Sequence, residues 1–314
     1  MYAIVFPGQG SQSVGMAADF LAQFPIARET FAQADEALGM PLSRIIAEGP
    51  DTRLRQTEIT QPAILTTSTA IHRVLVECGL PDAPAYLAGH SLGEYSAHVA
   101  AGSIPFATAV ALVHRRGRYM QAAVPEGEGA MAAVLGITGD VVARVCTGVP
   151  GVVAPVNFNS PEQTVIAGHA AAVAAAGEAL REAGARRIVP LDVSAPFHCE
   201  LMVSAMDQME KELACADISD AAIPVVSNVT AQPYTVASHT RELLTHQVCA
   251  PVQWVRCVER LASCGVRLVI EVGPGKVLTG LTQRIDRSLA RQAVVSPDDV
   301  PAAIEQTAAA QGAA

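Results

Sequence analysis

Residues 85–99 read Ala85-Tyr86-Leu87-Ala88-Gly89-His90-Ser91-Leu92-Gly93-Glu94-Tyr95-Ser96-Ala97-His98-Val99. A short apolar run is followed by G-x-S-x-G and then by a helical pattern, the order in which a strand, a sharp turn and a helix expose a serine at a sheet edge. Glycines flank the serine because the turn crowds the backbone. The segment predicts that Ser91 is a nucleophile. The alternative is a structural turn, since 24 glycines make chance matches common.

Short apolar runs alternate with segments of helical period along most of the chain. This alternation predicts an α/β fold with a parallel sheet. The expected strands cover residues 2–6, 85–89, 130–137, 152–157, 164–168, 186–192, 225–227 and 268–272. Helical period is clearest in residues 26–38, 61–78, 94–101 and 106–123.

The middle of the chain follows a different order. Residues 127–193 read strand, helix (140–146), strand, strand, helix (170–183), strand, which is the ferredoxin-like βαββαβ pattern. We expect a small subdomain there, inserted into a larger one made of residues 1–126 and 194–314. The last stretch, 297–314, is rich in alanine and polar residues and is expected to be a frayed tail.

Composition narrows the class of protein. Half of the 314 residues are apolar and 16% are charged, so a large buried core is expected. The net charge of −9 argues against general nucleic-acid binding. Neither a signal peptide nor an apolar run of about 18 residues is present, so no membrane association is expected. The seven cysteines lack metal-ligand spacing and are expected to be reduced, with no bound metal, in a cytoplasmic protein.

A nucleophilic serine needs a base. Of the eight histidines, His198 follows the strand expected at 186–192, in a short loop stiffened by Pro196. That position favours His198, although the other histidines remain alternatives. No carboxylate is an obvious partner for it, and a carbonyl or amide oxygen is expected to orient the imidazole instead.

Three arginines lie within the helix expected at 106–123. Arg116 falls on the same face as the apolar Leu112 and Val113, whereas Arg115 and Arg118 point elsewhere. A partly buried arginine needs an anion, and its guanidinium suits a substrate carboxylate. The alternative is an ordinary solvated helix face. In the loop after the first strand, the amide of Gln9 is a candidate oxyanion donor.

Four motifs together resemble the bacterial malonyl-CoA:acyl carrier protein transacylases over nearly the whole chain. They are Phe6-Pro7-Gly8-Gln9-Gly10-Ser11-Gln12, Gly89-His90-Ser91-Leu92-Gly93-Glu94-Tyr95-Ser96-Ala97, Val156-Asn157-Phe158-Asn159-Ser160-Pro161 and Glu271-Val272-Gly273-Pro274-Gly275. The resemblance implies an α/β-hydrolase-like subdomain with a ferredoxin-like insert. It also implies a monomer that has no bound cofactor and uses malonyl-CoA and phosphopantetheinylated acyl carrier protein.

The resemblance also implies roles for single residues. It implies that Ser91 is acylated, His198 is the base and Arg116 binds the malonyl carboxylate. The oxyanion donors would be the Leu92 N–H and Gln9, and the main-chain carbonyl of Gln247 would orient the histidine. The implied pocket residues are Gln61, Asn159 and Phe197, of which Phe197 would crowd the α-carbon of the acyl group.

The sequence is also compatible with three other functions besides a transacylase of fatty-acid synthesis. A trans-acting acyltransferase of a polyketide synthase would use the same chemistry on another carrier protein. A serine thioesterase or hydrolase would share the G-x-S-x-G turn without needing Gln9 or Arg116. A non-catalytic scaffold would retain only the fold.

Overall fold

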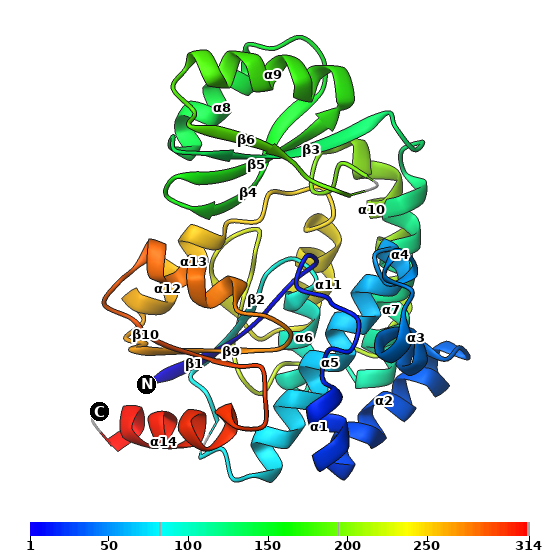
Figure 1. The fold of residues 1–314 in the computed structure, drawn as a ribbon, viewed down its shortest axis with the longest axis vertical. Helices are drawn as coiled ribbons and strands as arrows, with labels where there is room; N and C mark the ends of the chain where they lie inside the picture. The colour runs from blue at the N-terminus through cyan, green and yellow to red at the C-terminus, as the bar shows by residue number, and fades with distance from the viewer. Residues whose placement is uncertain (82, 194, 313–314) are drawn as a thin grey trace.

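The computed structural model describes residues 1–81, 83–193 and 195–312, and it shows two units stacked along the long axis of the molecule (Figure 1). The larger unit contains a six-stranded sheet in the order β10-β9-β1-β2-β7-β8. Its neighbouring strands are parallel except for β8, which is antiparallel to β7. The bounds are β1 Tyr2–Phe6, β2 Tyr86–Gly89, β7 Val225–Val226, β8 Pro233–Tyr234, β9 Leu268–Val272 and β10 Ala290–Val294.

Helices cover both faces of this sheet, which explains why β1 and β9 are buried throughout and, apart from Glu271, apolar. Alternate residues of β1 belong to different cores: Tyr2, Ile4 and Phe6 pack with α5 on one face, and Ala3 and Val5 pack with α12 and α13 on the other. The helices of this unit are α1 Ala18–Gln23, α2 Pro25–Leu38, α3 Leu42–Glu48, α4 Asp51–Leu54, α5 Thr57–Glu77, α6 Gly93–Ala100, α7 Phe106–Ala122, η1 Glu200–Met202, α10 Val203–Cys215, α11 Ala237–His246, α12 Trp254–Ser263, α13 Val277–Ile285 and α14 Asp299–Gly312.

The smaller unit has the predicted order of elements. It comprises β3 Gly129–Leu135, α8 Gly139–Thr147, β4 Val153–Ser160, β5 Gln163–His169, α9 Ala170–Glu182 and β6 Arg187–Pro190. The strands form an antiparallel sheet in the order β4-β5-β3-β6. Helices α8 and α9 pack on the face that carries Val134 and Ile166, whereas Met131 and Val165 on the opposite face join the core of the larger unit.

The expectation of a frayed C-terminal tail is wrong for the described part of that segment. Residues 299–312 form helix α14, which packs against β9 and β10. Val300, Ala303 and Thr307 are buried, at the spacing of one helix face. Alanine favours the helical conformation. The three buried side chains are therefore enough to hold the helix against the sheet. Residues 313–314 lie outside the described residues.

Two strands of the larger sheet, β8 and β10, were not among the expected strands. β8 has only two residues. β10 reads Ala290-Arg291-Gln292-Ala293-Val294 and so lacks a continuous apolar run, because it lies at the edge of the sheet and pairs only with β9. Within the described residues, no helix is both long enough and apolar enough to cross a bilayer.

Candidate active site

Ser91 lies in the turn between β2 and α6, with a backbone φ of 52°. The two flanking glycines are required by close packing. A Cβ on Gly89 would lie 2.0 Å from the carbonyl carbon of Gly93, and a Cβ on Gly93 would lie 2.1 Å from the carbonyl oxygen of Phe6. The turn is thus pressed against the end of β1, and its motif has a direct steric cause.

Asn228 holds this turn from a loop that follows β7. Its Oδ1 accepts a hydrogen bond from the Ser91 N–H at 2.6 Å, and its Nδ2 donates to the Gly89 carbonyl at 2.7 Å. Sequence reasoning missed this residue. The available signal was weak: a polar side chain just beyond a strand expected at 225–227, at the same sheet edge as Ser91.

His198 lies against the serine. Its Nε2 is 2.7 Å from Ser91 Oγ, and its Nδ1 is 2.8 Å from the main-chain oxygen of Gln247. A carbonyl oxygen only accepts, so Nδ1 carries the proton and Nε2 presents its lone pair to the hydroxyl. The side chain is 4% exposed, and burial, assisted by the charge of Arg116, lowers the pKa of His198 to about 3. The imidazole is therefore neutral at physiological pH.

Arg116 extends from α7 to the same point. Its Nη2 donates to Ser91 Oγ at 3.2 Å and to Gln247 Oε1 at 3.0 Å, and its Nη1 donates to Gln61 Oε1 at 2.7 Å. The residue is 2% exposed, and burial lowers the pKa of its guanidinium. Among the described residues, its Nε–H has no acceptor.

The two neighbouring arginines point away from this site. Arg115 is half exposed and pairs with Glu212 at 2.5 Å, and Arg118 is exposed. The helix-face argument therefore identified the one arginine of the three that is buried.

A cavity of about 150 Å³ opens beside Ser91 Oγ. The predicted residues that line it are Gln9, Gln61, Ser91, Leu92, Arg116, Asn159, Phe197 and His198. Gln247 is not one of the lining residues, but it contacts both Arg116 and His198. The Leu92 N–H has no acceptor among the described residues, whereas the Gln9 side-chain amide donates to Thr57 Oγ1 at 3.0 Å.

The smaller unit supplies the other wall of the cavity. Met131, Asn159 and Val165 come from its sheet, and Asn159 Oδ1 is 2.8 Å from Nε2 of His90, the residue before the serine. Met120 of α7 also lines the cavity. Sequence reasoning missed both methionines because an apolar residue in a pocket looks like any core residue.

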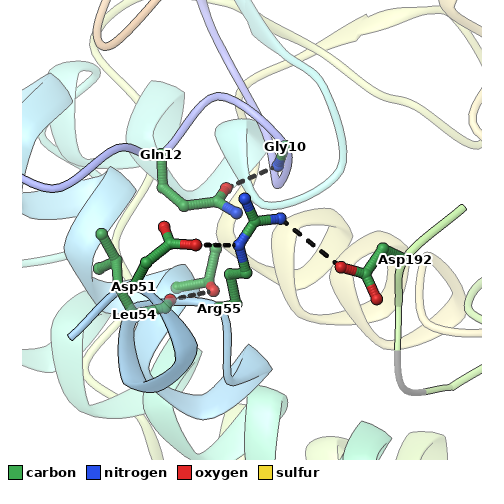
Figure 2. A network of polar contacts seen from close by, with 7 residues as sticks. Gly10, Gln12, Asp51, Leu54, Arg55 and Asp192 are labelled. Carbon is green, nitrogen blue, oxygen red and sulfur yellow. Dashed lines mark hydrogen bonds and ion pairs between the residues drawn. The ribbon is translucent and has the colours of Figure 1, made fainter. Parts of the chain in front are cut away.

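A polar network lies near this site, where α4 approaches the segment after β6 (Figure 2). Arg55 pairs with Asp51 at 2.5 Å and, more distantly, with Asp192 at 3.7 Å, while Gln12 Oε1 accepts from the Gly10 N–H at 2.8 Å. The Asp192 side chain is 94% exposed, so solvent screens this contact between the units. Asp192 directly follows the cavity residue Leu191, so the contact joins α4 to a segment that borders the cavity.

The chain is similar to known proteins over nearly its whole length. The acyl transferase domain family matches residues 3–306, so the chain is an acyltransferase by fold and family. The malonyl CoA-acyl carrier protein transacylase of Escherichia coli K12 is 51% identical over 97% of this chain and 99% of its own length. The Bacillus subtilis protein of that name is 44% identical, with 96% of each chain covered. The chain belongs to the family of malonyl CoA-acyl carrier protein transacylases.

Solved structures agree with this assignment. An acyl carrier protein S-malonyltransferase from Vibrio cholerae superposes with a TM-score of 0.94 at 49% identity, covering 96% of this chain and 99% of that one. A malonyl-transacylase in complex with a type II PKS acyl-carrier protein superposes with a TM-score of 0.95 at 46% identity, covering 97% and 99%.

Proposed function

We propose that this protein transfers the malonyl group from malonyl-CoA to the phosphopantetheine thiol of acyl carrier protein, through a malonyl ester on Ser91. The observation that carries the proposal is the 3.2 Å contact between Arg116 Nη2 and Ser91 Oγ. An acyl group attached to that oxygen would place a free carboxylate within reach of a buried cation. A hydrolase of neutral esters has no use for such a group.

In the first half-reaction, His198 Nε2 takes the proton from Ser91 Oγ as the oxygen attacks the thioester carbonyl of malonyl-CoA. The Gln247 carbonyl steadies the imidazolium through Nδ1–H. His198 then returns the proton to the sulfur of CoA as the carbon–sulfur bond breaks. The products are CoA and the malonyl ester.

The negative charge on the carbonyl oxygen needs donors in this step. We propose that the unpaired Leu92 N–H at the start of α6 provides one. The Gln9 amide would provide the second, by exchanging its bond to Thr57 for one to the oxyanion. Phe197 and Asn159 would limit the size of the acyl group.

In the second half-reaction, the phosphopantetheine thiol enters and gives its proton to His198. The thiolate attacks the ester carbonyl, the carbon–oxygen bond to Ser91 breaks, and the proton returns to Oγ. Neither step consumes water or a bound cofactor. The described residues contain no cluster of three or more His, Cys, Asp or Glu side chains that could bind a metal ion.

The strand orders of the two sheets support an α/β-hydrolase-like unit with a ferredoxin-like insert, and we assign residues 127–193 to the insert. We also propose a monomer, which the resemblance to the transacylase family implies, and a cytoplasmic location, which the sequence predicts.

The acyl carrier protein that accepts the malonyl group belongs to one of two classes, the carriers of fatty acid synthesis or those of polyketide synthases. The similarity to the Escherichia coli protein favours a role in supplying malonyl groups to fatty acid synthesis. Supply of a polyketide synthase is favoured by the solved complex with a type II PKS carrier. Competition between equal amounts of a fatty-acid carrier and a polyketide carrier for one pool of malonyl enzyme distinguishes them, and we expect the fatty-acid carrier to be used faster.

The proposal is tested on isolated malonyl enzyme. Addition of the phosphopantetheinylated carrier should discharge the ester and yield malonyl carrier protein, measured by intact mass. The same carrier without phosphopantetheine is the matched control and should leave the ester intact. Discharge to free malonate at the same rate with either carrier would identify a hydrolase instead.

A further inference from the structure

Glu94 is a fully buried carboxylate in the first turn of α6, three residues after Ser91. It accepts hydrogen bonds from Gln247 Nε2 at 2.7 Å, from the Asn228 N–H at 3.0 Å and from the Tyr234 hydroxyl at 2.9 Å. All three donors are neutral groups. Among the described residues the carboxylate therefore has no direct ion pair, although a buried charge without one is costly.

Arg116 is likewise a buried charge, here positive, without an oppositely charged hydrogen-bond partner among the described residues. Its hydrogen-bond acceptors are Gln61, Gln247 and Ser91, and all are neutral. One amide joins the two charges, because Gln247 Oε1 accepts from Arg116 and Gln247 Nε2 donates to Glu94. The guanidinium and the carboxylate thus form an ion pair with a single amide between its members.

The electrostatics of Glu94 agree with this pairing. Burial raises the pKa of Glu94 to about 7, and the hydrogen bonds together with the charge of Arg116 act in the opposite direction. The ionised form of Glu94 therefore depends on these hydrogen bonds and on the positive charge of Arg116.

We propose that Glu94, through the Gln247 amide, is the resident counter-charge of Arg116 and limits how tightly the loaded site retains a carboxylate-bearing acyl group. The inference rests on the proposed function. While the site is empty, Glu94 balances Arg116. When a malonyl group is on Ser91, its carboxylate becomes a second anion near Arg116, and its repulsion by Glu94 favours departure to the thiol. An uncharged acyl group lacks this repulsion.

Glu94→Gln removes the charge with almost no change in shape. The polar chain behind Glu94 can adapt, since Tyr234 also contacts His98 Nε2 at 2.7 Å and His98 Nδ1 contacts Ser103 Oγ at 2.8 Å. Burial lowers the pKa of His98 to about 3, so its ring is neutral and either nitrogen can carry the proton. The new amide nitrogen can then face Tyr234 while its oxygen still accepts from Gln247.

The experiment measures the loading equilibrium. Enzyme is mixed at about pH 8 with malonyl-CoA and increasing CoA, and the loaded fraction is read by intact mass. For Glu94→Gln we expect the equilibrium to move about tenfold toward malonyl enzyme, the size expected for removing one charge within roughly 10 Å at an effective dielectric constant of about 20. The equilibrium with acetyl-CoA should stay at the wild-type value.

Glu271→Gln is the matched control. Glu271 is also fully buried, but its carboxylate accepts from the backbone at the start of α13, namely from the N–H groups of Leu278 and Thr279. Its substitution should lower stability and leave the malonyl equilibrium unchanged. An equal shift in both variants would overturn the proposal, as would no shift, or a shift toward free enzyme, in Glu94→Gln.

A second measurement applies if Glu94→Gln is poorly folded. The double variant Glu94→Gln/Arg116→Met removes both charges, so it should have a higher unfolding temperature than Glu94→Gln alone. A double variant that is less stable than Glu94→Gln would overturn the pairing. Failure of wild type to load malonyl at all would instead reject the proposed function.

Discussion

Ser91 and His198 both have backbone φ angles in the left-handed region, 52° and 63°, and their side chains meet at 2.7 Å. Such angles are costly for residues with a side chain and persist only where the surroundings fix them. Asn228 fixes the turn at Ser91, and the Gln247 carbonyl fixes the imidazole. The serine and its base are therefore aligned before any substrate is bound.

The tight packing of the turn gives a first prediction. Gly93→Ala should cost about 2 kcal/mol or more of unfolding free energy and impair malonyl loading, because the new methyl group meets the Phe6 carbonyl. The control is Gly280→Ala in α13, where the methyl group meets nothing within 4 Å. That change should be neutral or stabilise by about 0.5–1 kcal/mol. Urea unfolding of both variants is the measurement, and equal stability would contradict the steric account.

Arg116 gives a second prediction, about selectivity. Arg116→Ala should reduce the rate of malonyl loading roughly 100-fold, the loss of a charge-assisted contact of about 2–3 kcal/mol. Acetyl loading should fall much less, so the ratio of the two rates is the informative quantity. Arg118→Ala, two residues along the same helix, should leave that ratio unchanged because Arg118 is exposed. A preserved malonyl preference in Arg116→Ala would rule out this role.

Burial of histidines predicts how stability depends on pH. Burial lowers the pKa of His98 and His198 to about 3 and that of His72 to about 4, so between those values and about 6.5 the unfolded chain binds more protons than the folded one. Glu94, with its pKa raised to about 7, acts in the opposite direction, and so does Glu271, whose pKa is also raised by burial.

Burial also lowers the pKa of His90, so the buried histidines outnumber the two carboxylates and the stability present above pH 6.5 should be lost as the pH falls. We expect the unfolding free energy to decrease by about 2 kcal/mol or more between pH 6.5 and 4.5. Urea unfolding across that range measures it. A constant or rising stability on acidification would show that these histidines become protonated while folded.

The C-terminal helix, which the sequence analysis expected to be a frayed tail, gives a further prediction. Removal of residues 297–314 would uncover the faces of β9 and β10 that α14 covers. We expect a loss of at least about 2 kcal/mol, from the burial of Val300, Ala303 and neighbouring side chains. A truncated protein as stable as the full chain would restore the frayed-tail interpretation.

The contrast between Ser91 and Glu94 shows what a sequence can predict here. The turn at Ser91 depends on residues within a few positions of it, so Gly89, Gly93 and the flanking apolar run predict it locally. Arg116 could be chosen because a helix face is also a local property. Glu94 bonds to Asn228, Tyr234 and Gln247, which are 134 to 153 positions away. Nothing in a local pattern shows which distant residues will meet, so that network appears only in the folded chain.

The central claim is that Ser91 carries the malonyl group, and its most direct test is the intact mass of the protein after mixing with malonyl-CoA. The wild type should gain the mass of one malonyl group, and digestion should place it on the peptide that contains Ser91. Ser91→Ala should gain nothing under the same conditions, whereas Ser96→Ala, a serine in the following helix, should load like the wild type. An unmodified wild type, or a malonyl group that persists in Ser91→Ala, would contradict the account.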